Sequence, residues 1–122
     1  MRAFIYDRHA TFLTAILDIR LDRCRGYAES RGWEVAGIWL DLGDHALSDD
    51  HRPQFDAMCR DLEASAGPTV CLVDDFARLT RDASRNSVMR RRIAQAGSHC
   101  ETSDGESDTA EHKQRGRLCT PH

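Results

Sequence analysis

A short, wholly apolar run near the middle of the chain constrains its fold more than any other feature. The run is TVCLV, at Thr69–Val73, and it shows no alternation of polar and apolar side chains. Gly67 and Pro68 mark a break immediately before it. A strand without a polar face is buried on both sides, as the central strands of parallel sheets are. The sequence therefore predicts a parallel sheet that contains this strand.

Strand-like and helix-like segments alternate on either side of this run. Leu17, Leu21, Cys24 and Ala28 recur at the spacing of one helix face, which predicts an amphipathic helix. The same kind of pattern predicts strands at 2–6 and 34–40 and helices at 16–31, from Pro53 to before Ala66, and 83–96, with Asp82 as the N-cap of the last. Alternation of this kind predicts a three-layer α/β/α fold with a mostly parallel central sheet of about four strands.

The composition changes after Gly97. Residues 98–122 are rich in Gly, Ser, Thr and charges of both signs, and Leu118 is their one large aliphatic residue. Such a segment buries little apolar surface. We expect one folded domain over residues 1–97 and a polar, flexible tail over residues 98–122, with one weak edge strand near 98–102.

Composition and charge exclude several classes of protein. The chain has 122 residues and a net charge of −3, so it is not a generally basic nucleic-acid binder, and any contact with DNA rests on a local patch. No apolar run approaches the roughly 18–20 residues of a membrane span. Cys24, Cys59 and Cys71 fall within apolar patterns and are expected in the core. We therefore expect a cytoplasmic protein without disulfides.

Two arginines follow the central strand closely. Asp74 and Asp75 come directly after it, and Arg78 and Arg81 follow three residues apart. Open α/β sheets bind ligands just beyond the carboxyl ends of their strands, and a guanidinium can donate two parallel hydrogen bonds to a phosphate. This edge is a candidate phosphate site. The alternative is a surface loop with two solvated arginines.

Four segments, in order, resemble the catalytic domain of serine site-specific recombinases, the resolvase/invertase family, over about residues 1–97. They are RAFIYDRHAT at the start, CRGYAESRGWEV, the Arg52-Pro53 pair and RLTRD. The resemblance implies a resolvase-like fold and DNA strand exchange, in which a serine hydroxyl attacks a phosphodiester while arginines hold its oxygens. It places Arg8, Arg52, Arg78 and Arg81 at the phosphate-binding positions. It implies no cofactor and no metal.

The chain departs from this family at the nucleophile. The family motif is Tyr-x-Arg-x-Ser, whereas this chain has Tyr6, Arg8 and then Ala10 in place of the serine. A methyl group cannot attack phosphorus. Thr11 is the nearest hydroxyl, but neighbouring side chains of an extended segment point to opposite sides, so we expect it to face away. Other departures are Arg20 for a glutamine, Ala77 for an aspartate and His45 for a serine.

These departures predict a degenerate recombinase domain that has lost strand cleavage and contacts DNA weakly or indirectly. A second hypothesis keeps it in recombination as a homo- or hetero-oligomer with recombinase-type domains, bound through the thin apolar stripe of the 83–96 helix. A third places zinc in the tail, at Cys100, His112, Cys119 and His122.

Overall fold

The computed structural model describes residues 1–48 and 50–108. Its elements, in chain order, are β1 (Arg2–His9), α1 (Ala15–Ser30), β2 (Glu34–Leu42), α2 (Asp44–Leu47), α3 (Pro53–Ala64), β3 (Thr69–Val73), the 3₁₀ turn η1 (Phe76–Arg78), α4 (Ala83–Gln95) and β4 (Cys100–Thr102). The four strands are hydrogen-bonded in the order β2-β1-β3-β4, and every neighbouring pair is parallel. The predicted three-layer fold is therefore confirmed.

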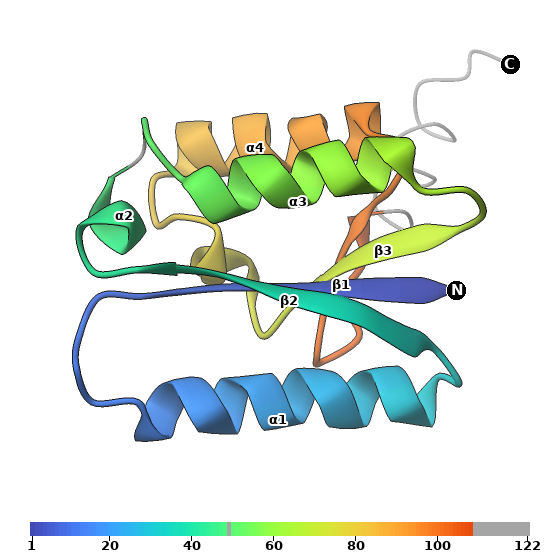
Figure 1. The fold of residues 1–122 in the computed structure, drawn as a ribbon, viewed down its shortest axis with the longest axis horizontal. Helices are drawn as coiled ribbons and strands as arrows, with labels where there is room; N and C mark the ends of the chain where they lie inside the picture. The colour runs from blue at the N-terminus through green and yellow to red at the C-terminus, as the bar shows by residue number, and fades with distance from the viewer. Residues whose placement is uncertain (49, 109–122) are drawn as a thin grey trace, which may run out of the picture.

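The apolar run Thr69–Val73 forms β3, and all five of its residues are buried. It lies between β1 and β4 and pairs with both. The lack of polar alternation is explained by helices on both faces. Figure 1 shows α1 alone below the sheet and α3 and α4 together above it.

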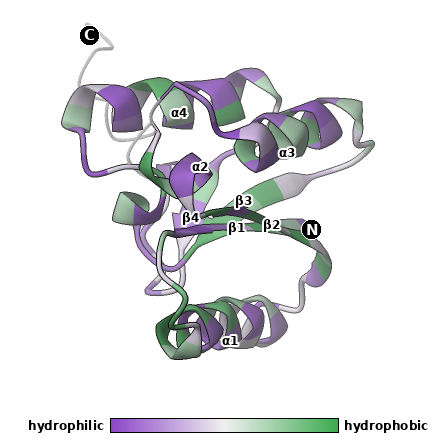
Figure 2. Ribbon diagram, turned by 60° about the vertical axis from the view of Figure 1, so that its left-hand side comes forward, coloured by the Kyte–Doolittle hydropathy of each residue, from purple (hydrophilic) through white to green (hydrophobic). Residues whose placement is uncertain are grey.

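Each face of the sheet has its own hydrophobic cluster. On the α1 side, Ala3, Ile5, Val70 and Leu72 of the sheet meet the predicted helix stripe Leu17, Leu21, Cys24 and Ala28. On the other side, residues of β1, β3 and β4 meet Phe55, Met58 and Leu62 of α3 and Met89 and Ile93 of α4. Figure 2 shows the hydrophobic strands between the two helix layers. Cys24, Cys59 and Cys71 are buried as predicted. No helix in the described residues is both long and apolar enough to cross a bilayer.

Local sequence signals set the helix ends where they were predicted. Gly32 has φ of +72°, and the amide of Trp33 donates to the carbonyl of Ala28, which closes α1 with a left-handed C-cap. The carboxylate of Asp82 accepts from the amide of Arg85 at 3.0 Å and caps α4.

Two strands run further than their apolar residues indicate. β1 continues through Asp7 to His9, and β2 continues through Asp41 to Leu42, so both strands extend beyond the predicted ranges 2–6 and 34–40. Both aspartates are buried. Asp41 accepts from the hydroxyl of Tyr6 at 2.7 Å and from the amides of Gln54 and Phe55, the first turn of α3. A polar residue at a strand end is thus buried because another element satisfies it.

The folded unit continues past Gly97. Cys100–Thr102 form β4, which is buried and pairs with β3, so the predicted edge strand is present and the boundary at Gly97 lies one strand too early. Cys100 lies inside the sheet, and His112, Cys119 and His122 of the zinc hypothesis lie outside the described residues. In residues 1–48 and 50–108 no cluster of three or more His, Cys, Asp or Glu is arranged for a metal.

Asp74 joins three segments of the fold, the helix α1 and the ends of β3 and β4. Arg23 of α1 donates to both of its carboxylate oxygens, and Ser103 after β4 donates to Oδ1 at 2.7 Å. Burial by itself raises the pKa of Asp74, but the hydrogen bonds from Arg23 and Ser103 outweigh it, and the pKa lies below its ordinary value.

We expect Asp74 to contribute stability at neutral pH that is lost in acid. Because its pKa is lower in the folded state, the contribution is complete above the unfolded value of about 3.9 and disappears as pH falls through the folded pKa. Asp74→Asn should therefore lower the unfolding free energy at pH 7 and make it less steep in pH below about 4. Urea unfolding across pH measures this, with the exposed Asp22→Asn as control. Equal acid limbs in both variants would contradict it.

Candidate functional site

Arg8 lies at the carboxyl end of β1, inside the strand and not beyond it. One terminal nitrogen of its guanidinium donates to the carbonyl of Ala77 at 2.9 Å, and the other donates to the carbonyl of Ala46 at 3.3 Å. Its Nε is buried and has no hydrogen-bond partner among the described residues. Arg8 therefore bridges the turns after β2 and β3 and keeps one donor unpaired at the sheet edge.

Arg52 is almost completely buried, with 3% of its surface exposed, immediately before α3. Its Nη1 donates to the carbonyl of Leu79 at 2.6 Å and lies 3.3 Å from the hydroxyl of Tyr6, and its Nε donates to the carbonyl of Ser48. A buried guanidinium needs such a set of acceptors. Arg52 thus fastens the turn after β3 to the start of α3.

Arg78 lies in η1, directly after the central strand. Its Nη1 lies 3.7 Å from Oδ1 of Asp7, and its Nε lies 3.6 Å from Oδ1 of Asp75. The Nε of Arg78 is also buried and makes no hydrogen bond within the described residues. Arg81, three residues later, is exposed.

Three of the four predicted arginines, Arg8, Arg52 and Arg78, contact the β1 end or the turn after β3 at one edge of the sheet, whereas Arg81 is exposed. Burial lowers the pKa of Arg8 below its ordinary value, and the positive charges of Arg52, Arg78 and, less strongly, Arg81 lower it further. Charges affect one another in this way only when they are close. The region therefore concentrates positive charge in a chain whose net charge is −3, with Asp7 and Asp75 at 3.7 and 3.6 Å from Arg78. Two buried N–H donors within it, the Nε atoms of Arg8 and Arg78, make no hydrogen bond to the described residues. An anion with several oxygens would satisfy both conditions.

A buried ion pair behind this edge was not anticipated from the sequence. Arg20 of α1 donates to both carboxylate oxygens of Asp7, at 2.7 and 3.2 Å, and also to the carbonyl of Arg8 at 3.3 Å. Both partners are buried. The available signal was that Arg20 falls on the buried stripe between Leu17 and Leu21, where a charge needs a partner.

The segment after β1 presents no activated hydroxyl. Ala10 is exposed and carries only a methyl group. Oγ1 of Thr11 lies 3.1 Å from Nε2 of His9, which itself lies 2.5 Å from the carbonyl of Leu13. A carbonyl only accepts, so Nε2 carries the proton, and Nδ1 faces the guanidinium of Arg20 at 3.4 Å. His9 is therefore not placed to remove the proton of Thr11.

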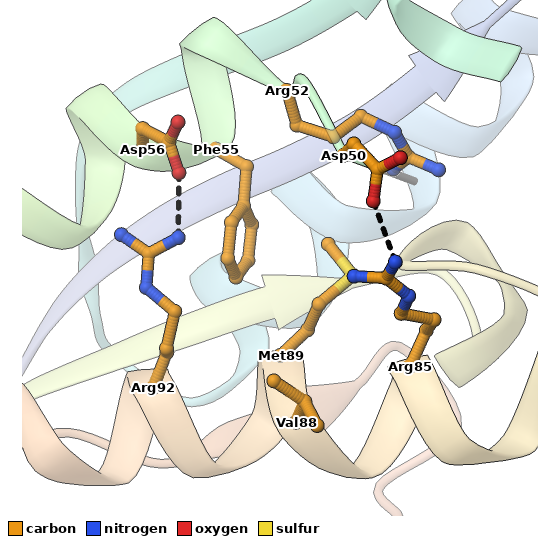
Figure 3. Close-up of a pocket in the computed structure, with 8 residues that line it drawn as sticks. All are labelled: Asp50, Arg52, Phe55, Asp56, Arg85, Val88, Met89 and Arg92. Carbon is orange, nitrogen blue, oxygen red and sulfur yellow. Dashed lines mark hydrogen bonds and ion pairs between the residues drawn. The ribbon is translucent and has the colours of Figure 1, made fainter. Parts of the chain in front are cut away.

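A shallow pocket lies between α3 and α4 and shares Arg52 with the edge where Arg8 lies. Phe55, Val88 and Met89 line its apolar floor. The ion pair Asp56–Arg92 crosses it from α3 to α4, the pair Asp50–Arg85 joins the segment before α3 to α4, and Arg52 closes one end (Figure 3). Two of its three arginines are paired with aspartates, and the third, Arg52, donates to main-chain carbonyls instead.

A family model and several solved structures match this chain. The family model for the resolvase N-terminal domain matches residues 3–120. The chain belongs to this family. No curated protein matches it. The match also extends beyond Gly97, in agreement with the buried strand β4.

Solved structures share the fold at low identity. The N-terminal catalytic domain of TP901-1 integrase aligns with a TM-score of 0.73 and 20% identity over 98% of this chain and all of that one. A resolvase family site-specific recombinase from Streptococcus pneumoniae gives 0.71 and 19%, over 97% and 90%. The C-terminal catalytic domain of ISC1926 TnpA, an IS607-like serine recombinase, gives 0.69 and 20%, over 84% and 69%. The resolvase family membership and these folds support a DNA-recombination domain.

Proposed function

We propose that this resolvase domain binds a DNA phosphate at Arg8, Arg52, Arg78 and Arg81 and does not cleave the strand. The observation that carries the proposal is the buried Nε donors of Arg8 and Arg78, which make no hydrogen bond within the described residues and lie among like charges. Unsatisfied buried donors are costly in a folded protein. Phosphate oxygens would accept from both and offset the repulsion between the guanidiniums.

The absence of a nucleophile supports the second part of the proposal. Cleavage by this family's chemistry needs an alcohol oxygen that attacks phosphorus and holds the 5′ phosphate covalently while the 3′ oxygen leaves with a proton. Ala10 has no such oxygen. The ring nitrogen nearest to the Thr11 hydroxyl, Nε2 of His9 at 3.1 Å, is held against the carbonyl of Leu13 as a donor. The domain then acts in recombination by binding, as a catalytically inactive member of its family.

The alternative is a domain that modulates an active recombinase by binding it. The stripe on α4 that suggested this is not available, because Met89 and Ile93 are buried against α3 and the sheet. Val88 is the large apolar residue of α4 that stays exposed. A partner surface must therefore be sought elsewhere on the domain.

We expect inorganic phosphate to stabilise the protein through Arg8. At a phosphate concentration ten times Kd, the stabilisation is about 1.4 kcal/mol, which raises Tm by roughly 5 °C for a domain of this size. Arg8→Ala should abolish the rise, and Arg85→Ala, on the rim of the other pocket, should keep it. Thermal melts in phosphate and in chloride of equal ionic strength measure the difference.

Two outcomes would contradict the proposed function. A phosphate-dependent rise that persists in Arg8→Ala would place the anion elsewhere. A covalent protein–DNA adduct, formed on supercoiled DNA that carries candidate sites and mapped to this domain by denaturing electrophoresis, would show that the domain does cleave. The two assays test phosphate binding and loss of cleavage separately.

A further inference from the structure

One side chain of α4 holds both ends of the turn that carries Arg78. Nδ2 of Asn86 donates to the carbonyl of Phe76 at 2.8 Å and to the carbonyl of Thr80 at 3.0 Å. These carbonyls stand two residues before and two residues after Arg78. Asn86 itself lies in the first turn of α4, where its main-chain amide donates to the carbonyl of Asp82 at 2.8 Å. The turn from Phe76 to Thr80 is therefore tied to the beginning of a packed helix.

Arg90 fixes the direction in which the side-chain amide of Asn86 points. Nη1 of Arg90 donates to Oδ1 of Asn86 at 3.3 Å. A side-chain amide has one accepting end and one donating end, and an arginine only donates. The oxygen therefore faces Arg90, which leaves both hydrogens of Nδ2 for the two carbonyls of the turn. Arg90 is held in its place by the carboxylate of Asp108, and its guanidinium lies 4.0 Å from the centre of the Phe76 ring.

Asn86 is the uncharged member of three side chains that hold this turn. The other two are guanidiniums, Arg8 on the carbonyl of Ala77 and Arg52 on the carbonyl of Leu79. Both also belong to the proposed anion site, so a bound phosphate would compete with the carbonyls for their donors. An uncharged amide gains less from a phosphate than a guanidinium does. The hydrogen bonds of Asn86 therefore stay with the turn when an anion binds.

We propose that Asn86 is a positioning residue, which keeps the turn in the place where Nε of Arg78 faces the anion, and this inference rests on the proposed function. Nε of Arg78 makes no hydrogen bond within the described residues. The guanidinium lies 3.7 Å from Asp7 and 3.6 Å from Asp75, which is too long for a hydrogen bond. The direction of Arg78 is therefore set mainly by the main chain of its turn. Donors that are placed before binding hold an anion more tightly than donors that must be ordered by it.

The affinity of the whole chain for inorganic phosphate, measured by isothermal titration calorimetry, tests this role. Asn86→Ala should raise the Kd about tenfold, because the loss of two hydrogen bonds frees the turn. Ile93→Val is the matched control, since it weakens the buried face of the same helix seven residues away from Asn86. It should lower Tm and leave the Kd unchanged, which a purely structural role of Asn86 would not distinguish from Asn86→Ala.

Asn86→Asp distinguishes the hydrogen bonds of the side chain from its shape. An aspartate has the same shape and still accepts from Arg90, but its ionised carboxylate cannot donate to the carbonyls of the turn. The Kd should rise at least as much as in Asn86→Ala. Ser87→Asp adds the same charge at the next position, which is exposed, and should change the Kd by less than about threefold. Unchanged affinity in Asn86→Asp would mean that the donors are not what places Arg78.

Hydrogen exchange of the main-chain amides of Arg78 and Leu79 reports on the turn when no anion is present. These amides donate to the carbonyls of Asp75 and Phe76, both at 3.1 Å, and should exchange about tenfold faster in Asn86→Ala than in Ile93→Val. Equal exchange in the two variants would overturn the inference, and so would an unchanged phosphate Kd in Asn86→Ala. An unaltered protein that binds no phosphate would instead overturn the proposed function, whereas faster exchange in Asn86→Ala would still support the hold of Asn86 on the turn.

Discussion

Replacing Asp7 by alanine is expected to lower the free energy of unfolding by about 3–5 kcal/mol, the cost of leaving a buried charge without its partner. Arg20 is buried in α1, and both of its bonds to a carboxylate go to Asp7. The loss is a large part of the roughly 5–15 kcal/mol that holds a domain together. Urea unfolding at neutral pH measures it.

A double variant distinguishes the effect of the Asp7–Arg20 ion pair on stability from the effect of leaving one of its charges alone. Asp7→Ala with Arg20→Leu removes both charges and fills the space with an apolar side chain, and replacement of a buried pair in this way is often neutral or stabilising. We expect the double variant to be more stable than Asp7→Ala alone. The exposed pair Asp22–Arg25 is the control, and breaking it should change stability by less than about 1 kcal/mol. A loss below about 1 kcal/mol for Asp7→Ala would contradict the prediction.

Asp7 also links this pair to the arginine cluster. Its Oδ1, which accepts from Arg20, lies 3.7 Å from Nη1 of Arg78. The carboxylate thus offsets part of the repulsion among the arginines when no anion is bound. Removal of Asp7 should consequently make the folded state depend more strongly on added phosphate than the unaltered protein does.

The strands and helices can be predicted from local sequence, but the buried polar residues at the ends of the strands cannot. The uninterrupted run at Thr69–Val73 identifies a central strand because burial on both faces excludes polar residues. Asp82 and Gly32 mark helix ends because they act on neighbouring backbone groups. Asp7 and Asp41 sit in buried strand ends because Arg20 and the amide of Gln54 satisfy them, each 13 residues along the chain, and no local pattern contains that pairing.

The candidate site shows the same division. The positions of Arg8 and Arg78 at one edge follow from parallel topology, since the carboxyl ends of neighbouring strands meet there, whereas Arg52 was placed there only by the family resemblance. The hydrogen bonds of Arg8 to the carbonyls of Ala46 and Ala77 do not follow, because backbone groups of distant turns leave no trace in side-chain identity.

We expect Ala10→Ser to form no covalent adduct with supercoiled DNA. Restoring the hydroxyl supplies the attacking oxygen, but the surroundings of position 10 still differ from those of a cleaving site. Both terminal nitrogens of Arg8 are held by main-chain carbonyls, so only its Nε is ready for a phosphate oxygen. A reacting phosphate needs several donors placed before the attack, because preorganised charge supplies most of the rate enhancement.

Two further departures from the family motif, Ala77 and Arg20, are also expected to prevent Ala10→Ser from forming an adduct. Ala77 offers no carboxylate beside the arginines, and Arg20 holds the carbonyl of Arg8 and the ring of His9, which fixes the segment that leads to position 10. The informative comparison is Ala10→Ser alone against Ala10→Ser with Arg20→Gln and Ala77→Asp. Denaturing electrophoresis of the protein–DNA mixture is the measurement, with Ala10→Val as a control that adds bulk without a hydroxyl. An adduct with Ala10→Ser alone would mean that one missing oxygen atom is the whole defect and that Arg8 can release its carbonyls during the reaction.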